Sequence, residues 1–147
     1  MESEFDRPSQ TEDKYKELIK ITETAPRSVA TVAIVVKNFP PKPKDKNAQD
    51  RQTEELVTVF ITTLTQALLV SQNNGKNTFD VMVDCKDTSS KHVNYKFGKS
   101  FIALAKKVFD GNLGRCVIFN TGNLFKTVYK VISPLIDKPT REKIKIF

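Results

Sequence analysis

The chain has 147 residues, of which 39% are hydrophobic and 28% are charged. That is enough for one domain with a hydrophobic core. Lysine and arginine outnumber aspartate and glutamate by 24 to 17, and the net charge of +7 favours anionic partners such as phospholipid headgroups, nucleic acid or an acidic protein surface. We find no apolar run of the roughly 20 residues that cross a bilayer, and from the polar N-terminus we expect no secretory signal.

The two cysteines, Cys85 and Cys116, each fall at or inside an expected strand, and neither belongs to a CxxC pair. Isolated cysteines of this kind form no disulfide framework and no zinc site, and they are typical of a reducing compartment. We therefore expect a cytoplasmic protein, either peripheral on membranes or within a large intracellular assembly. We expect no metal and no cofactor.

The N-terminal part, residues 1–26, is expected to hold a polar tail and one short helix. Residues 1–10 are expected to be disordered. Residues 11–24 show a weak helical periodicity, with Thr11 as the cap and Pro26 as the stop. The main domain is expected to occupy residues 27–147.

The main domain begins with residues 29–36 (VATVAIVV), whose β-branched, apolar composition predicts a strand buried on both faces. Residues 37–47 hold three prolines and four lysines, so they form either a solvated loop or a contact for anionic surfaces. Residues 50–71 repeat apolar side chains at three- and four-residue steps, which predicts a helix with Asp50 as its cap.

Strands and helices continue to alternate up to the end of the chain. Strands are expected at residues 78–85, 115–120 and 143–147, with a helix at residues 94–110 and a second one after residue 123. Strands that are linked through helices run parallel with right-handed crossovers. The sequence therefore predicts a single α/β sandwich, in which helices pack on a mostly parallel or mixed β-sheet.

The most unusual stretch is residues 124–136, an apolar segment that Pro134 should kink or end. Its apolar band is wide enough to suggest contact on two sides, with the core below and a lipid or partner above; the alternative is an ordinary core helix. Basic side chains surround it, and an apolar face beside a basic rim suits a membrane interface.

Catalytic motifs are missing. His92 is the only histidine, so a Ser-His-Asp arrangement would need it as the base, and the glycines form no nucleotide-binding fingerprint. The chain also lacks the aromatic strand, GxxG loop and zinc finger of common nucleic-acid modules. We expect neither an enzyme nor a nucleic-acid-binding protein, and no catalytic residue is assigned.

Four blocks are distinctive together: residues 79–86 (FDVMVDCK), 114–120 (GRCVIFN), 131–137 (VISPLID) and 140–144 (TREKI). Their order and spacing resemble the CRAL-TRIO lipid-binding domain, a family that includes phosphatidylinositol-transfer, retinal-binding and tocopherol-binding proteins. That family typically reads Val-Asp-Leu-x-Gly, then Ile-Asn-Ala-Pro, then Lys-Pro-Phe-Leu-Asp-x-x-Thr-x-x-Lys-Ile. The likeness covers about residues 29–147.

The resemblance implies a pocket for one lipid or other small hydrophobic ligand, with the sheet as its floor and residues 124–136 as a movable gate helix. The gate and pocket residues would be Leu124, Phe125, Val128, Tyr129, Ile132 and Ile136. Contacts to a headgroup or an anionic membrane surface would come from Thr88, Ser89, Lys130 and Lys143.

A second interpretation stays open because the related domains continue beyond the position of Phe147. The chain would then be a truncated, degenerate copy without a ligand, serving as a structural or adaptor subunit of a larger assembly. Its C-terminal strand would offer an edge to a protein partner, since exposed strand edges pair readily.

Overall fold

The computed structural model describes residues 14–22 and 24–147. Its helices and strands are β1 (Ile19–Ile21), β2 (Ala30–Val35), α2 (Lys46–Asn73), β3 (Phe79–Asp84), α3 (Tyr95–Val108), β4 (Leu113–Phe119), α4 (Asn123–Ile132), α5 (Lys138–Glu142) and β5 (Ile144–Ile146). Short 3₁₀ turns follow β2 (η2, Val36–Asn38), precede α3 (η3, Ser90–His92) and follow α4 (η4, Ser133–Leu135).

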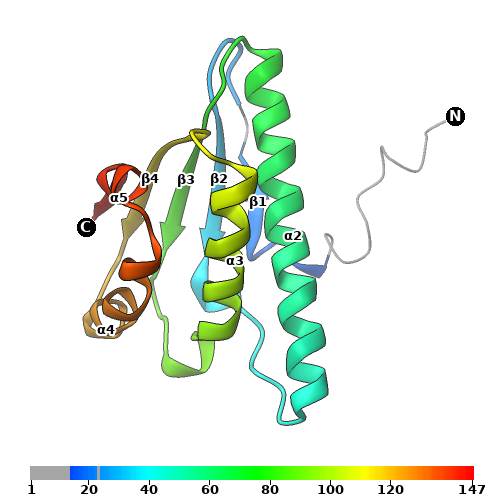
Figure 1. Cartoon of the computed structure of the whole chain (residues 1–147), viewed down its shortest axis with the longest axis vertical. Helices are drawn as coiled ribbons and strands as arrows, with labels where there is room; N and C mark the ends of the chain where they lie inside the picture. The colour runs from blue at the N-terminus through cyan, green and yellow to red at the C-terminus, as the bar shows by residue number, and fades with distance from the viewer. Residues whose placement is uncertain (1–13, 23) are drawn as a thin grey trace, which may run out of the picture.

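The strands form one five-stranded sheet in the order β1-β2-β3-β4-β5. β1 is antiparallel to β2, and the other neighbours are parallel. Because the strand order follows the chain and crossovers are right-handed, the connecting helices gather on one face. Figure 1 shows α2 and α3 in front of the sheet and α4 at the lower left, below β4. The predicted α/β architecture, with helices packed on a mixed sheet, is confirmed.

The register of the strands places alternate apolar side chains on the helix-covered face. Ala30 pairs with Phe79, Val32 with Val81, and Cys116 with Ile144. Side chains alternate across a pleated strand, so each of these rows faces the same side. Ala30, Val32, Phe79 and Val81 are all buried. The core therefore lies between this face and the helices.

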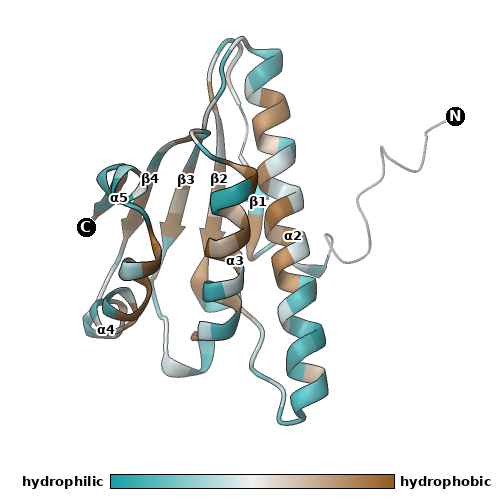
Figure 2. Ribbon diagram, viewed as in Figure 1, coloured by the Kyte–Doolittle hydropathy of each residue, from teal (hydrophilic) through white to brown (hydrophobic). Residues whose placement is uncertain are grey.

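Helix α2 is the central helix of that core. Leu56, Phe60, Leu64 and Ala67 recur at three- or four-residue steps and are each at most 4% exposed. The first turns of α2 are polar, as Figure 2 shows. By length and composition alone α2 could cross a membrane. Because its apolar stripe packs on the sheet, it is the core helix of this fold.

Aromatic rings attach α3 to α2. Phe60 lies 4.8 Å from Phe97 and 5.4 Å from Phe101 between ring centroids, in edge-to-face arrangements that favour aromatic pairs. Phe39, from the proline-rich loop, lies 5.5 Å from Phe97. This cluster fixes α3 beside α2, where it forms the roof of the site described below.

Within the described residues, the helix predicted at residues 11–24 does not extend beyond Lys14. Residues 15–18 form a turn, and Ile19–Ile21 form the edge strand β1. Ile19 pairs with Ile34 and is only 4% exposed, as the alternating IKI pattern allows. Pairing with β2 therefore overrode a weak helical periodicity. The predictions for residues 1–13 and residue 23 lie outside the described residues.

The structure corrects the predicted start of α2 and confirms the predicted end of α4. Helix α2 begins at Lys46, because the Asp45 carboxylate accepts a hydrogen bond from the Ala48 amide at 2.9 Å; Asp50 is not the cap and pairs instead with Lys96. At the other end of the chain, α4 stops at Ile132 and continues as the 3₁₀ turn that contains Pro134. The predicted break at this proline is confirmed.

Candidate functional site: an apolar cavity between sheet and helices

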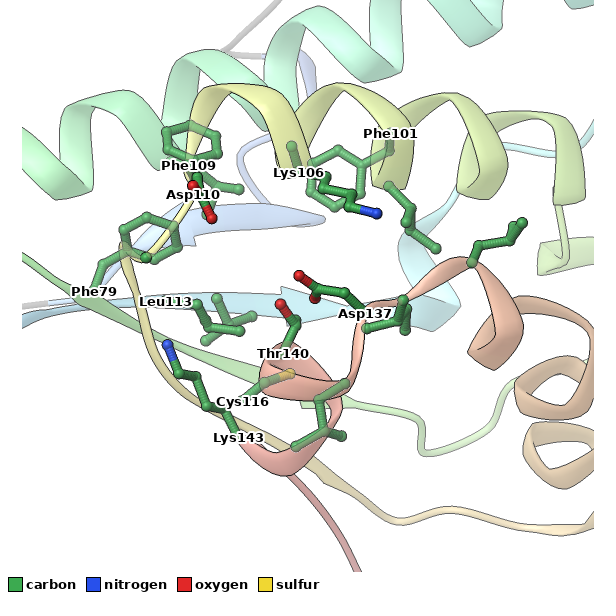
Figure 3. Close-up of a pocket in the computed structure, with 18 of the residues that line it drawn as sticks. Phe79, Phe101, Lys106, Phe109, Asp110, Leu113, Cys116, Asp137, Thr140 and Lys143 are labelled. Atoms are coloured by element: carbon green, nitrogen blue, oxygen red, sulfur yellow. The ribbon is translucent and has the colours of Figure 1, made fainter.

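A cavity of about 240 Å³ lies between the sheet, α3 and the segment that joins α4 to β5. Figure 3 shows its lining side chains converging from these elements. The residues around it are Ile34, Leu64, Phe79, Val81, Val83, Phe101, Ile102, Ala105, Lys106, Phe109, Asp110, Gly111, Leu113, Cys116, Leu135, Ile136, Asp137, Thr140, Lys143 and Ile144. The surface is predominantly apolar, as expected of a site for a hydrophobic ligand.

The floor of the cavity follows from the strand register. Val81 on β3 pairs with Cys116 on β4, which pairs with Ile144 on β5, so these three side chains form one row beneath the cavity. Phe101 and Ala105 form the roof of the cavity. They lie one helical turn apart, so both are on the face of α3 that is turned toward the cavity. One end closes where Phe79 packs edge-to-face on Phe109 at 5.4 Å.

Charged side chains lie on both walls of the cavity opening. They come from the C-terminal end of α3 (Lys106 and Asp110) and from the η4–α5 segment (Asp137 and Lys143). Figure 3 shows Lys106 and Asp137 on facing sides of the opening. A hydrogen bond from Thr140 and the nearby Lys106 ammonium hold the pKa of Asp137 below its usual value. The cavity thus pairs an apolar interior with a polar rim.

Both cysteines are free thiols. Burial raises the pKa of Cys116 to about 12 and that of Cys85 to about 11. A thiol with such a pKa carries almost no thiolate at neutral pH, so neither side chain is a nucleophile. Cys116 acts as a small hydrophobic group in the cavity floor.

Two of the site residues inferred from the family likeness line this cavity: Ile136 and Lys143. The other apolar members lie on α4 and are not part of its lining: Leu124, Phe125, Val128, Tyr129 and Ile132. No residue of α4 is buried, and the Phe125 and Tyr129 rings stack on each other at 5.5 Å. Helix α4 therefore lies beside the cavity, joined to it through η4.

The remaining headgroup candidates lie outside the lining. Thr88 and Ser89 belong to the loop after β3, and Lys130 is exposed on α4. The Ser89 amide donates to the His92 ring nitrogen Nδ1 at 2.9 Å, so the single histidine caps a 3₁₀ turn. The Thr88 hydroxyl is buried, with no hydrogen-bond partner among the described residues.

Sequence reasoning missed the α3 side of the cavity. Phe101, Ala105 and Phe109 were visible as an apolar stripe at four-residue steps, but a stripe does not reveal whether it meets a packed core or a cavity. Within residues 14–22 and 24–147, no group of three or more His, Cys, Asp or Glu side chains is arranged to hold a metal ion.

These features define a small α/β domain with an apolar cavity between its sheet and its helices. The family model of the CRAL/TRIO domain matches residues 24–147. The chain therefore belongs to the CRAL-TRIO family, whose members generally bind or transfer lipids.

The crystal structure of Sfh5 has the same fold, with a TM-score of 0.72 at 18% sequence identity. The match covers 97% of this chain and 50% of that chain, so this chain spans half the length of that protein. A comparison with curated protein sequences finds no significant match.

Proposed function

We propose that this chain binds a lipid or other small hydrophobic ligand, without catalysis, in the cavity between the sheet and α3. The observation that carries this proposal is the apolar cavity itself, about 240 Å³ in volume and lined by Val81, Cys116, Phe101 and Ile136. Burial of apolar ligand surface there gains about 25 cal/mol per Å² removed from water. Membership of a family that generally binds or transfers lipids supports the same conclusion.

The polar rim would hold the ligand's headgroup. Lys106 and Lys143 both lie at the cavity and have no carboxylate within 4.0 Å among the described residues. Lys143 is also the position that the family likeness assigns to headgroup contact. Helix α4, which has no buried residue, would act as the gate and contact a membrane while ligand enters or leaves. We place this exchange on the cytoplasmic face of an anionic membrane.

The test is native mass spectrometry of the purified chain, followed by extraction and identification of any bound lipid. We expect a stoichiometric ligand that is lost in Ile136→Asp, because this change puts a charge into the apolar lining. The matched control is Leu104→Asp, since Leu104 is 39% exposed on α3 and does not line the cavity. A folded protein that neither carries lipid nor acquires any from vesicles contradicts the proposal.

The sheet face opposite the helices, which no described helix covers, favours a second candidate, an adaptor that binds a protein. Parallel sheets normally have both faces covered, yet Met82 is 42% exposed on the face away from the helices. Phe147, which continues the edge strand β5, is 73% exposed. A ligand-free chain that forms a stable complex through this face, and loses it on Met82→Asp, would support this role over lipid binding.

A further inference from the structure

We propose that the outer edge of β5 is a docking site for an extended, acidic segment of a partner protein, which would join the five-stranded sheet as a further strand. This inference goes beyond ligand binding in the cavity. It rests on the second candidate function, the adaptor role, and gives that role a partner of defined chemistry. It follows from the hydrogen-bond pattern of β5, the exposure of its side chains and the charge beside them.

The backbone of β5 leaves one row of hydrogen-bonding groups unpaired. β5 is the last strand in the sheet order, so no other strand among the described residues pairs with its outer side. The Lys143 carbonyl accepts a hydrogen bond from a β4 amide at 2.9 Å, and the Phe147 amide donates to a β4 carbonyl at 2.8 Å. Because backbone groups alternate between the two edges of a strand, those of Ile144 and Ile146 point away from β4. Such a row is a template on which an extended segment can pair.

The side chains at this edge are more exposed than those at the opposite edge of the sheet. Ile146 is 44% exposed and Phe147 is 73% exposed. On β1, which forms the other edge, Ile19 is only 4% exposed. Of the two edges, the one at β5 is therefore the more accessible to a partner.

The register of β5 defines the side chains that an added strand needs. Ile146 pairs with Ile118, which is buried. Lys145 pairs with Val117, and Val117 pairs with Met82, which is exposed on the face away from the helices. Side chains alternate across a strand, so the added strand needs apolar residues beside Ile146. Every second residue then lies on the other face, beside Lys145.

Charge decides which residues suit the position beside Lys145. Its side chain is exposed and has no carboxylate within 4.0 Å among the described residues. Opposite charges directly across a strand pair stabilise the pairing, and like charges oppose it. An acidic residue therefore fits this position.

A second copy of this chain fits the edge badly. Antiparallel pairing of two β5 strands about Lys145 would place the two lysines opposite each other. The net charge of +7 on each copy adds to this repulsion. A membrane surface offers no backbone groups to pair with Ile144 and Ile146. The occupant that remains is an acidic segment of another protein.

The experiment uses two synthetic peptides of about seven residues, in which valine alternates either with glutamate or with lysine. Each peptide is titrated against the whole chain at low salt, and amide hydrogen exchange is followed by NMR. We expect the glutamate peptide to bind and to slow exchange at the Ile144 and Ile146 amides. At about ten times its Kd the slowing should be about tenfold, because only the free fraction exchanges. The Lys145 amide, which points to β4, should change less.

Backbone methylation distinguishes strand pairing from simple charge attraction. N-methyl groups on the glutamates remove the amide donors of one edge of the peptide, and N-methyl groups on the valines remove those of the other. An added strand pairs through one edge only. One of these two methylated peptides should therefore bind at least about tenfold more weakly than the other.

Charge reversal tests the chemistry of the partner. The parent chain should prefer the glutamate peptide over the lysine peptide about fivefold or more, and Lys145→Glu should remove this preference. Lys20→Glu is the matched control, because Lys20 is exposed on β1 at the opposite edge of the sheet. This control changes the net charge equally and should keep the preference.

The outcomes distinguish this inference from the functions proposed above. Equal binding of the two methylated peptides, protection only of amides outside β5, or no binding of the glutamate peptide up to about 1 mM overturns the inference. Lipid binding is decided separately, by native mass spectrometry of the same chain. A protein complex that is lost on Met82→Asp, without protection of Ile144 and Ile146, supports the adaptor role and overturns docking at the β5 edge.

Discussion

Among single residues, Gly114 on β4 leaves no room for a side chain beside Asp80 on β3. A Cβ atom on Gly114 would lie 2.5 Å from the Asp80 oxygen Oδ1. The same carboxylate accepts hydrogen bonds from the Arg115 amide at 3.1 Å and from the Arg115 side chain at 3.2 Å. Asp80 therefore cannot move aside without losing partners. The glycine permits this arrangement at the irregular pairing of β3 with β4.

We expect Gly114→Ala to lower the free energy of unfolding by about 1–3 kcal/mol, measured by urea denaturation. Gly98→Ala is the matched control, because nothing lies within 4 Å of a Cβ atom there and the residue is inside α3. That change should raise stability by up to about 1 kcal/mol, since alanine favours helices. Equal effects at both positions would show that the contact with Asp80 has no energetic role.

A second residue pair joins the ends of β3 and β4. The Asn120 side chain donates a hydrogen bond to Asp84 at 3.0 Å, and the Lys86 amide donates another at 2.9 Å. These two hydrogen bonds lower the pKa of Asp84. Asn120 has a φ of +57°, a left-handed conformation that asparagine adopts more readily than most other residues. Here the pair acts as a structural link between two loops.

Removing the Asn120 donor should change how stability depends on pH. A lowered carboxyl pKa stabilises the fold above the unfolded value of about 3.9, and this stabilisation is lost as pH falls through the folded pKa. In Asn120→Ala the Asp84 pKa should rise, as followed by NMR titration. The stability gap between this variant and the parent should narrow below about pH 4. Asn47→Ala, in an exposed turn of α2, should leave the Asp84 titration unchanged.

At the scale of elements, α4 differs from the other long helices because it lacks a buried residue. Its apolar side chains are only partly buried or are exposed to solvent. Pro134 prevents the helix from extending into α5. A helix that is held this weakly can separate from the domain at small cost, because few buried contacts are lost. This is the physical basis for assigning it the role of a gate.

We expect Tyr129→Asp on α4 to slow lipid transfer between vesicles about tenfold or more, because a charge on this helix opposes its contact with the membrane. Equilibrium binding of soluble ligand should change little, since Tyr129 does not line the cavity. Thr127→Asp, at an exposed position of the same helix, is the control. Loss of equilibrium binding in Tyr129→Asp would instead place this ring in the binding site.

At the scale of the whole molecule, positive charge gathers at the carboxyl end of the parallel strands. The loops after β2 and β3, residues 36–46 and 85–94, carry six lysines against two aspartates. This is the lower end of the molecule in Figure 1, where α4 also begins. The basic loops and the apolar gate helix therefore share one end, which is the arrangement that an anionic membrane would attract.

Binding to anionic vesicles should weaken with added salt and with loss of these lysines. Lys42, Lys44 and Lys46 are all exposed, and each basic residue near such a surface contributes about 1 kcal/mol. Changing all three to glutamine should therefore lower vesicle affinity about 100-fold at low salt, measured by co-sedimentation. Changing Arg27, Lys76 and Lys107, which are exposed elsewhere, removes the same charge and should have a much smaller effect. Equal losses would mean that net charge alone drives the association.

The sequence by itself determined the central strands, the two long helices and the break at Pro134. Runs such as VATVAIVV, a regular apolar stripe and a helix-breaking proline act through local sterics and periodicity, which need no knowledge of distant residues. The family likeness predicted which segments of the chain form the site. It also predicted Ile136 and Lys143 as site residues, and both line the cavity.

Only the tertiary structure decided the edge strand β1, the faces of the sheet and the location of the cavity. β1 forms because Ile19 pairs with Ile34 of β2 across the intervening turn. This pairing outweighs the weak helical preference of the local sequence. The cavity exists because α3 and the η4–α5 segment meet over the sheet without filling the space above Cys116. Apolar side chains that fill a core and apolar side chains that surround an empty volume have the same pattern in sequence, because only the spacing of the elements distinguishes them.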